Sequence, residues 1–271
     1  MNELQSKLVE MLHWFDGFCI KNEFSYYAVD GTMLGVARHA GFIPWDDDID
    51  VCLPRPDYEK MKSKFGNTQI GKYYLEMPNS NDEAFASPYA KLYDTSTTLI
   101  EHYQKPLIRG VFIDIFPLDS LSCDEGDAIK KLAKIKRKQY FFMSRVVAYS
   151  SRRKVYKNLA IIFSKIIPHS IVSNKQLRIE IDALCKSEKY DINKWGGMCL
   201  SDWGRKEIMP LSVFGKPTRY KFENIEVFGV QNFDTYLTRV YGNWEMLPPE
   251  AKRVSRHDYL SLDLNKSYLE L

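Results

Sequence analysis

Four aspartates crowd five positions in the run Trp45-Asp46-Asp47-Asp48-Ile49-Asp50-Val51. Carboxylates this close repel one another unless a cation lies among them. From Asp48 onward the run alternates with a period of two, so a β-strand would carry Asp48 and Asp50 on one face and apolar residues on the other. The run therefore predicts a strand with one metal-binding face and one packed face. Ligands that offer only oxygen favour Mg²⁺ or Mn²⁺.

A further carboxylate stands alone in the segment Ile113-Asp114-Ile115. Its surroundings, from Val111 to Phe116, suit a buried β-strand. A carboxylate in such a strand is costly unless a positive charge compensates it. We therefore predict that Asp114 is a third ligand of the same ion. The alternative is a side chain that faces solvent on a half-exposed strand.

The remaining hydrophobic patterns predict both helices and strands. Helices are expected at about 4–21, 33–38, 57–65, 125–148, 152–167, 175–186 and 233–241, and strands at about 25–29, 48–53, 89–93 and 111–116. Gly31 ends the first strand, and Thr32 is expected to cap the helix that follows. The predicted fold class is α/β or α+β, a mixed sheet with flanking helices. No linker divides the chain, so we expect one domain, 1–271, with a helical subdomain at about 124–189.

The helical subdomain is strongly basic. From Ala128 to Ile179 the chain holds fourteen of its 38 Lys and Arg residues and none of its 35 Asp and Glu residues. This segment predicts contact with an anionic surface, either phospholipid headgroups or a phosphate-rich polymer; a solvated helix surface is the alternative. The five cysteines are scattered, which predicts reduced thiols and no zinc site. The N-terminal residues lack a cleavable apolar signal, so we expect a cytoplasmic protein.

A Gly-Thr turn at the start of a helix, an Asp-x-Asp strand and one Asp on a later strand form the arrangement of nucleotidyltransferase-like palms. The block Asp30–Asp50, DGTMLGVARHAGFIPWDDDID, closely resembles the signature of the LicD family of phosphocholine transferases. Two later blocks resemble the same family: Arg109–Asp119, RGVFIDIFPLD, and Tyr241–Trp244, YGNW, with Pro248-Pro249 and His257. The blocks keep the family order, so the likeness covers most of the chain. The related fukutin-type phosphotransferases carry a zinc-binding insertion that these cysteines do not match.

The resemblance implies transfer of a phosphorylated alcohol from a CDP-linked donor to a sugar hydroxyl. The implied donor is CDP-choline, and the implied acceptor is a lipid-linked glycan precursor of teichoic acid, lipopolysaccharide or capsule. The resemblance also assigns site residues. The catalytic metal ligands would be Asp48, Asp50 and Asp114, with Asp46 or Asp47 as an additional ligand, and Gly31 and Thr32 would lie against the donor phosphates.

Four other side chains are candidates for binding the donor. Arg38 and Arg109 could clamp phosphate, because a guanidinium matches phosphate oxygens, or could form structural ion pairs. Lys91, beside the predicted site, has the same two interpretations. Trp45 could stack on the cytosine ring or contact the quaternary ammonium of choline, or it could simply pack the turn.

Two other functions fit the same residues. The cargo could be phosphoglycerol, phosphoribitol or phosphoethanolamine, each from its own CDP-alcohol donor and delivered to a cell-surface glycan. Alternatively, the basic helices could bind an anionic polymer without catalysis, although the complete aspartate set argues against this. We expect no nucleic acid partner. We expect the protein at the inner face of a bacterial membrane, with peripheral contact to anionic lipid.

Overall fold

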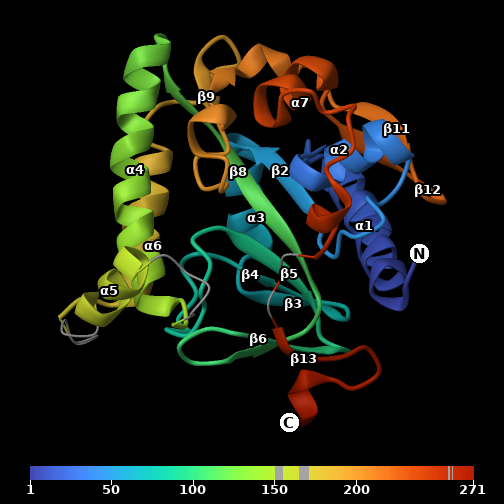
Figure 1. Ribbon diagram of the computed structural model, residues 1–271, viewed down its shortest axis with the longest axis vertical. Coiled ribbons are helices and arrows are strands. Elements are labelled where there is room, and N and C mark those ends of the chain that lie inside the picture. Colours follow the sequence, from blue (N-terminus) through green and yellow to red (C-terminus); the bar gives the residue numbers. More distant parts are fainter. Residues whose placement is uncertain (150–154, 165–170, 256, 258) are drawn as a thin grey trace.

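The protein consists of helices packed around a mixed β-sheet (Figure 1). The computed structural model describes residues 1–149, 155–164, 171–255, 257 and 259–271. The helices are α1 (Glu3–Lys21), α2 (Asp30–His39), α3 (Arg55–Phe65), α4 (Glu125–Val146), α5 (Val155–Ser164), α6 (Asn174–Cys185) and α7 (Phe233–Tyr241). The strands are β1 (Tyr27–Ala28), β2 (Asp50–Pro54), β3 (Thr68–Ile70), β4 (Tyr73–Glu76), β5 (Ala90–Asp94), β6 (Thr98–Glu101), β7 (Leu107–Arg109), β8 (Phe112–Ser122), β9 (Trp195–Gly197), β10 (Met209–Pro210), β11 (Thr218–Phe222), β12 (Ile225–Gly229) and β13 (Tyr259–Asp263).

The main sheet joins strands from both ends of the chain. Its order is β11-β12-β1-β2-β8-β5-β4-β3, and β9 extends it by pairing with β8 and β10. A smaller sheet has the order β13-β6-β7, so the C-terminal strand lies beside strands from the first half of the chain. This mixed sheet with its flanking helices confirms the predicted fold class.

Strand register brings three predicted site residues together. β2 and β8 run parallel with Asp50 opposite Asp114, and β5 runs antiparallel to β8 with Lys91 opposite Asp114. Paired residues on neighbouring strands point to the same face of a sheet. One face therefore carries two carboxylates and an ammonium. The other face is apolar, since Val51 and Ile115 are fully buried.

Two boundaries near the aspartate run differ from the prediction. The strand begins at Asp50, so Asp48 lies in the preceding loop. Helix α2 begins at Asp30 with Val29 as its N-cap residue, so the expected cap by Thr32 was wrong. The Thr32 hydroxyl instead accepts a hydrogen bond from the backbone N–H of Asp50, at 2.8 Å. Thr32 therefore fixes the start of β2 against the first turn of α2.

Strand β8 is longer than predicted because it continues through Pro117. The backbone N–H of Asp114 donates to Ile49, on the β2 side. Alternation along the strand turns the nitrogen of Pro117 to the opposite side. There β5 pairs only as far as Ile115, and β9 begins to pair at Asp119. Proline is tolerated because it falls in this gap and removes no hydrogen bond between strands.

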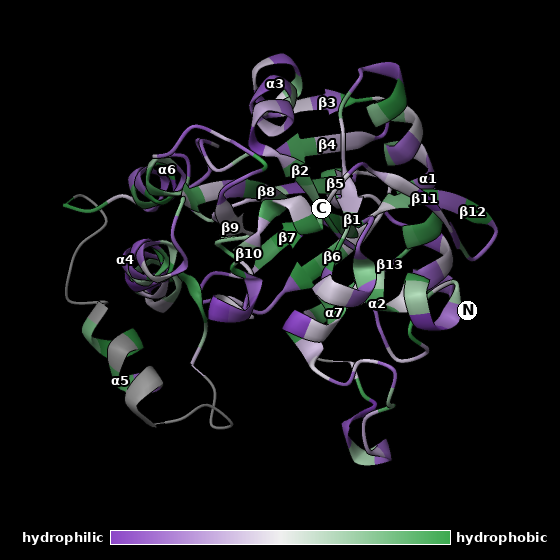
Figure 2. Ribbon diagram, turned by 90° about the horizontal axis from the view of Figure 1, so that it is seen from above, coloured by the Kyte–Doolittle hydropathy of each residue, from purple (hydrophilic) through white to green (hydrophobic). Residues whose placement is uncertain are grey.

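The basic segment forms a helical arm, α4 to α6. Helices α4 and α6 pack side by side at one edge of the molecule, and α5 projects beyond them (Figure 2). The helix predicted at 152–167 is observed as α5, and the rest of that prediction lies outside the described residues. None of the described helices combines the length and the apolar character needed to cross a bilayer.

Candidate active site

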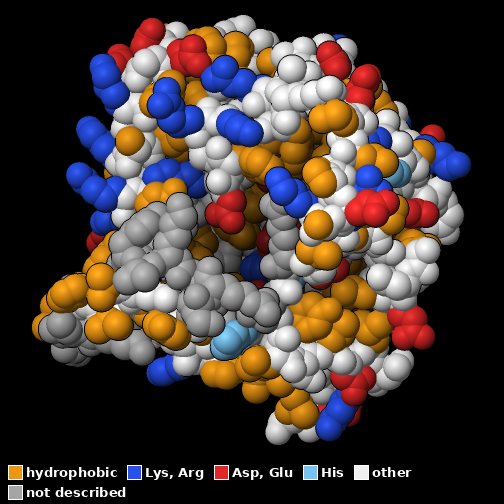
Figure 3. Space-filling view, in the orientation of Figure 1, with side chains coloured by type: hydrophobic (Ala, Val, Ile, Leu, Met, Phe, Trp, Pro, Cys, Tyr) orange, Lys and Arg blue, Asp and Glu red, His pale blue; other side chains and the backbone are white. Residues whose placement is uncertain are grey.

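A cavity of about 720 Å³ opens on the charged face of the sheet. Figure 3 looks into the hollow, where acidic and basic side chains lie near the centre of the molecule. Its lining includes most of the predicted site residues: Gly31, Arg38, Trp45, Asp46, Asp48, Asp50, Lys91 and Asp114. The fold therefore gathers into one cavity residues that are spread over more than eighty positions of the sequence.

Six aspartates line this cavity, and four of them, Asp46, Asp48, Asp50 and Asp114, are called the aspartate cluster here. Asp50 lies on β2, Asp114 lies on β8, and the other two lie in the loop before β2. Gly31, in the first turn of α2, packs against this loop. A Cβ atom at position 31 would lie 2.7 Å from Oδ2 of Asp46, so a side chain there would displace the carboxylate. Glycine is therefore needed for the close approach of α2 to the cluster.

Burial and mutual repulsion raise the pKa values of the cluster. The pKa of Asp46 rises to about 8, first because the carboxyl is buried and then because of the charge on Asp48. Burial and the Asp48 charge likewise raise the pKa of Asp50 well above its usual range. Burial also raises the pKa of Asp48. Without a metal, the cluster therefore retains protons at neutral pH.

Lys91 provides the positive charge beside Asp114. Its ammonium lies 3.0 Å from Oδ1 of Asp114 and 3.7 Å from the carboxylate of Glu101. Burial alone would lower the pKa of Lys91, but the two carboxylates outweigh it and raise the pKa. The hydroxyl of Tyr89 donates to the other oxygen of Asp114, at 3.3 Å. Lys91 thus forms an ion pair and also lines the cavity, so its position is compatible with both predicted interpretations.

His257 ties the C-terminal segment to the aspartate run. Its Nδ1 lies 2.8 Å from Oδ1 of Asp47, and its Nε2 lies 3.5 Å from Asp48. Although burial would lower it, the pKa of His257 is raised to about 9 by its hydrogen bond to Asp47 and by the charge on Asp48. Asp47 also accepts a hydrogen bond from Ser255 and does not line the cavity. Asp47, Asp48 and His257 each bring a potential ligand atom to within 4.8 Å of the others, whereas Asp46 lines the cavity, so both Asp46 and Asp47 remain candidates for the additional ligand.

A buried acidic pair behind the cluster was missed by the sequence reasoning. Asp30 begins α2 with a φ of 46°, and Glu207 ends a short 3-10 helix near β10. The hydroxyl of Ser201 lies 3.3 Å from each carboxylate, and Tyr236 donates to Asp30 at 3.2 Å. Burial raises the pKa of Asp30 to about 6 and that of Glu207 well above its usual range. The pair therefore holds a proton, and no local sequence signal connects Glu207 with Asp30.

Two predicted donor-binding residues lie outside the cavity. Arg109 forms ion pairs with Glu76, at 3.0 Å, and with Asp82, at 2.5 Å, and does not line the cavity. Its position supports the structural ion pair and gives no support to a phosphate clamp. Thr32 is buried and its hydroxyl is engaged by the backbone of Asp50, so it acts beneath the cavity surface.

Arg38 and Trp45 do reach the cavity. Arg38 donates from Nη1 to the backbone carbonyl of Trp244, at 3.0 Å, which joins α2 to the segment after α7. The guanidinium of Arg253 lies 5.7 Å from the centroid of the Trp45 ring. Trp45 therefore packs beneath a cation and still borders the cavity, so both of its predicted roles fit this position.

Known proteins are similar to this chain in sequence. Residues 23–155 match the family described as LicD/FKTN/FKRP, nucleotidyltransferase domain. The chain is 28% identical over 261 residues to the lipopolysaccharide cholinephosphotransferase LicD of Haemophilus influenzae, an overlap of 95% of this chain and 96% of that protein. These matches confirm the resemblance to the LicD family that the sequence motifs indicated. Uncharacterized proteins of Rickettsia prowazekii and Rickettsia typhi are each 46% identical to it over 37 residues, 14% of this chain and 14% and 12% of theirs.

The segment that matches the LicD family carries the aspartate cluster, Lys91 and Asp30. Glu207 and His257 come from the chain that follows it. Both residues contact carboxylates of the matched segment or their hydrogen-bond partners. The C-terminal half of the chain therefore contributes to the same site.

The aspartate cluster offers ligands that suit a divalent cation. Its donors are all oxygen atoms, which Mg²⁺ and Mn²⁺ prefer. Lys91 and His257 offset part of the negative charge. Burial first, and then the charge on Asp48, raises the pKa values of Asp46 and Asp50. A divalent cation would supply positive charge to this part of the cavity.

The metal-free protein is expected to lose stability as pH rises from about 4 to about 8. Aspartates of an unfolded chain release protons near pH 3.9, roughly, whereas Asp46 keeps its proton up to about pH 8. The folded state then binds more protons in this window, so the free energy of unfolding falls as pH rises. His257, with its pKa raised to about 9, adds to the loss above about pH 6.5.

Thermal unfolding in a chelator would measure this effect as a falling Tm. Added Mg²⁺ should recover most of the loss at pH 8, because a cation binds the deprotonated carboxylates. An Asp46→Asn variant should show a flatter pH profile than the wild type. A wild-type Tm that climbs steadily from pH 5 to pH 8 in chelator would contradict the proton-retaining cluster.

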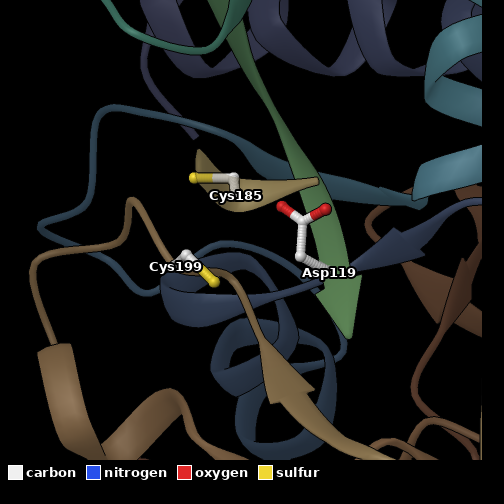
Figure 4. A group of neighbouring side chains, drawn as sticks. All are labelled: Asp119, Cys185 and Cys199. Carbon is white, nitrogen blue, oxygen red and sulfur yellow. The ribbon is translucent and has the colours of Figure 1, made fainter. Parts of the chain in front are cut away.

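A second group of potential metal ligands lies away from the cavity. The side chains of Asp119, Cys185 and Cys199 come within 4.8 Å of one another (Figure 4). Both oxygens of Asp119 accept hydrogen bonds from Arg55, at 2.6 and 2.7 Å. Because the guanidinium already neutralises this carboxylate, a metal ion there would face a positive charge. Cys185 and Cys199 are both free and buried.

Proposed function

We propose that this chain transfers phosphocholine from CDP-choline to a sugar hydroxyl of a teichoic-acid, lipopolysaccharide or capsule precursor, with Mg²⁺ or Mn²⁺ as cofactor. The supporting observation is a cavity lined by the aspartate cluster, in a chain that matches a lipopolysaccharide cholinephosphotransferase along nearly its whole length. Phosphoglycerol, phosphoribitol and phosphoethanolamine are the alternative cargoes, because the cluster would act on the donor diphosphate through the metal and would not select the alcohol.

The donor diphosphate would lie between the aspartate cluster and the start of α2. Gly31 lines the cavity at this point, and the N–H groups in the first turn of a helix favour a phosphate. Arg38 and Lys91 line the same cavity and would contact phosphate oxygens. When held by the cluster, Mg²⁺ supplies positive charge that neutralises the diphosphate and the departing CMP.

The acceptor hydroxyl must lose a proton as its oxygen attacks phosphorus. Asp114 is our candidate for the proton acceptor because it lines the cavity and its carboxylate is held in place by Lys91 and Tyr89. Trp45, also in the cavity lining, would stack on the cytosine ring of the donor.

Ligand-induced stabilisation tests the donor assignment. Purified protein with Mg²⁺ is heated with CDP-choline, CDP-glycerol, CDP-ribitol or CDP-ethanolamine, and CMP serves as the common control. The preferred donor should give the largest rise in Tm, because stabilisation grows with the ratio of ligand concentration to Kd. If another CDP-alcohol gives the largest rise in Tm, the transferred group is the phospho-alcohol of that donor and not phosphocholine. No donor exceeding CMP would refute the CDP-alcohol proposal.

We also propose that the helical arm holds the protein against an anionic membrane, where a lipid-linked acceptor would lie. Three apolar side chains occupy one face of α5 and are exposed by about half or more: Leu159 by 48%, Ile162 by 52% and Phe163 by 65%. Lys and Arg side chains line the outer edge of α4 above them (Figure 3). Lys134 and Arg137 of this helix are both exposed. Apolar insertion next to basic charge suits an interface rich in anionic lipid.

Vesicle sedimentation tests the membrane proposal. The triple variant Leu159→Gln/Ile162→Gln/Phe163→Gln should bind phosphatidylglycerol vesicles about tenfold more weakly than the wild type. The matched control Leu260→Gln/Leu269→Gln changes exposed leucines outside the arm and should bind like the wild type. If the triple variant also binds normally, apolar insertion is excluded, and salt-sensitive retention on a soluble polyphosphate would then favour the anionic-polymer alternative.

A further inference from the structure

Beside the aspartate cluster, the cavity has an aromatic wall. The hydroxyl of Tyr89 reaches Asp114, and the ring of Tyr89 lies 4.1 Å from the ring of Phe116, centroid to centroid. Phe116 follows Asp114 by two residues on β8, so both side chains point into the cavity. Tyr103 lines the cavity as well, and its hydroxyl is bound by Glu101 at 3.3 Å. The rings of Tyr89 and Phe116 therefore lie next to Asp114.

Asp202 adds a negative charge to the same wall. It is exposed to solvent in the cavity lining, and no described Lys, Arg or His forms an ion pair with it. Burial lowers the pKa of Lys136, and the charge on Asp202 partly offsets this effect. The Lys136 ammonium is buried and donates hydrogen bonds to Gln139 and to the backbone carbonyl of Ser201. Asp202, Tyr89 and Tyr103 therefore line one cavity, with the carboxylate free of a paired cation among the described residues.

We infer that Asp202, Tyr89, Tyr103 and Phe116 form the subsite for the quaternary ammonium group of the donor. A quaternary ammonium cannot donate hydrogen bonds, so it is recognised by aromatic faces together with an unpaired negative charge. In phosphocholine, one ester oxygen and two methylene groups separate phosphorus from nitrogen. If the phosphorus of the phosphocholine group lies near Asp114, its ammonium group lies over the neighbouring rings. This inference rests on the proposed function and names the residues that would select its cargo.

Donor selectivity tests the subsite. Kd and KM are measured with Mg²⁺ for CDP-choline and for CDP-glycerol, whose polyol carries no charge. Asp202→Asn should weaken CDP-choline about tenfold and leave CDP-glycerol unchanged within about twofold. Tyr89→Leu and Tyr89→Phe both lose the hydroxyl that donates to Asp114, so their comparison isolates the ring: Tyr89→Phe should retain the preference for CDP-choline over CDP-glycerol, and Tyr89→Leu should lose it. Glu23→Gln removes an exposed carboxylate outside the cavity and controls for net charge.

The results also separate this inference from the proposed function. If the wild type prefers CDP-choline but Asp202→Asn binds both donors as the wild type does, the ammonium subsite is wrong and the phosphocholine function stands. Equal weakening of both donors in Asp202→Asn would likewise overturn the subsite, because a general effect is not recognition of the ammonium. If the wild type prefers CDP-glycerol, the choline function itself fails.

Discussion

Asp50→Asn should reduce turnover by at least about 10²- to 10³-fold while the protein stays folded, the range expected when a main group stabilising transition-state charge is lost. Asp50 begins β2 directly opposite Asp114, and its backbone is fixed by hydrogen bonds to Thr32 and Val29. Asparagine preserves the shape and these backbone contacts. It removes one negative charge from the cluster that would hold the metal and the donor diphosphate.

The same substitution should have two opposite effects on stability. In a chelator the Asp50→Asn variant should melt at a higher temperature than the wild type, because burial and then the charge on Asp48 disfavour the ionised carboxylate and raise the pKa of Asp50. With Mg²⁺ at a hundredfold excess over Kd, the wild type should gain about 2.7 kcal/mol, and the variant should gain much less. Loss of turnover with an unchanged response to Mg²⁺ would show that Asp50 acts in some way other than as a metal ligand.

Asp127→Asn serves as the matched control for this experiment. Asp127 is an exposed aspartate in the first turn of α4, paired with Lys130 on the surface. Its replacement also removes one negative charge, but outside the cavity. Turnover and the response to Mg²⁺ should stay at wild-type levels, so a change in the control would point to net charge instead of the cluster.

The core of the candidate site was predictable because its signals are local. The alternation that starts at Asp50 and the lone Asp114 in an apolar segment each reveal a strand face within a few residues, whereas Asp48 lies in the loop before β2. What the sequence did not contain was the register that sets Asp50 opposite Asp114 and Lys91. That register comes from the order of strands in the sheet, which depends on contacts across the whole chain.

The predictions that were wrong or missing also failed because they depended on contacts between distant parts of the chain. Arg109 lies near a predicted ligand strand in sequence, but β7 joins the smaller sheet and turns the guanidinium to Glu76. Thr32 was expected to cap α2, yet its hydroxyl is taken by the backbone of β2. Glu207 was missed because only the tertiary fold buries it near Asp30. Local patterns indicate which face a residue occupies, and distant packing decides its partner.

Arg55→Met should destabilise the protein by about 3–5 kcal/mol, the cost of leaving a buried charge without its partner. The side chain of Arg55 is 7% exposed and joins three elements. From α3 it donates to both oxygens of Asp119 on β8, at 2.6 and 2.7 Å, and to Asp182 on α6, at 2.6 Å. Asp182 would keep Lys62 and Lys186, but the described residues offer Asp119 no second cation.

Urea unfolding of Arg55→Met and Arg55→Met/Asp119→Asn would separate packing from charge. The double variant should recover part of the lost stability, because asparagine carries no charge that needs a partner. Turnover per folded molecule should stay near the wild-type value in both variants, since Asp119 lies five residues beyond Asp114 on β8 and outside the cavity lining. A loss below about 1 kcal/mol in Arg55→Met would show that water or a neighbouring cation replaces the guanidinium, and that this buried ion pair does not hold α3 and α6 to the sheet.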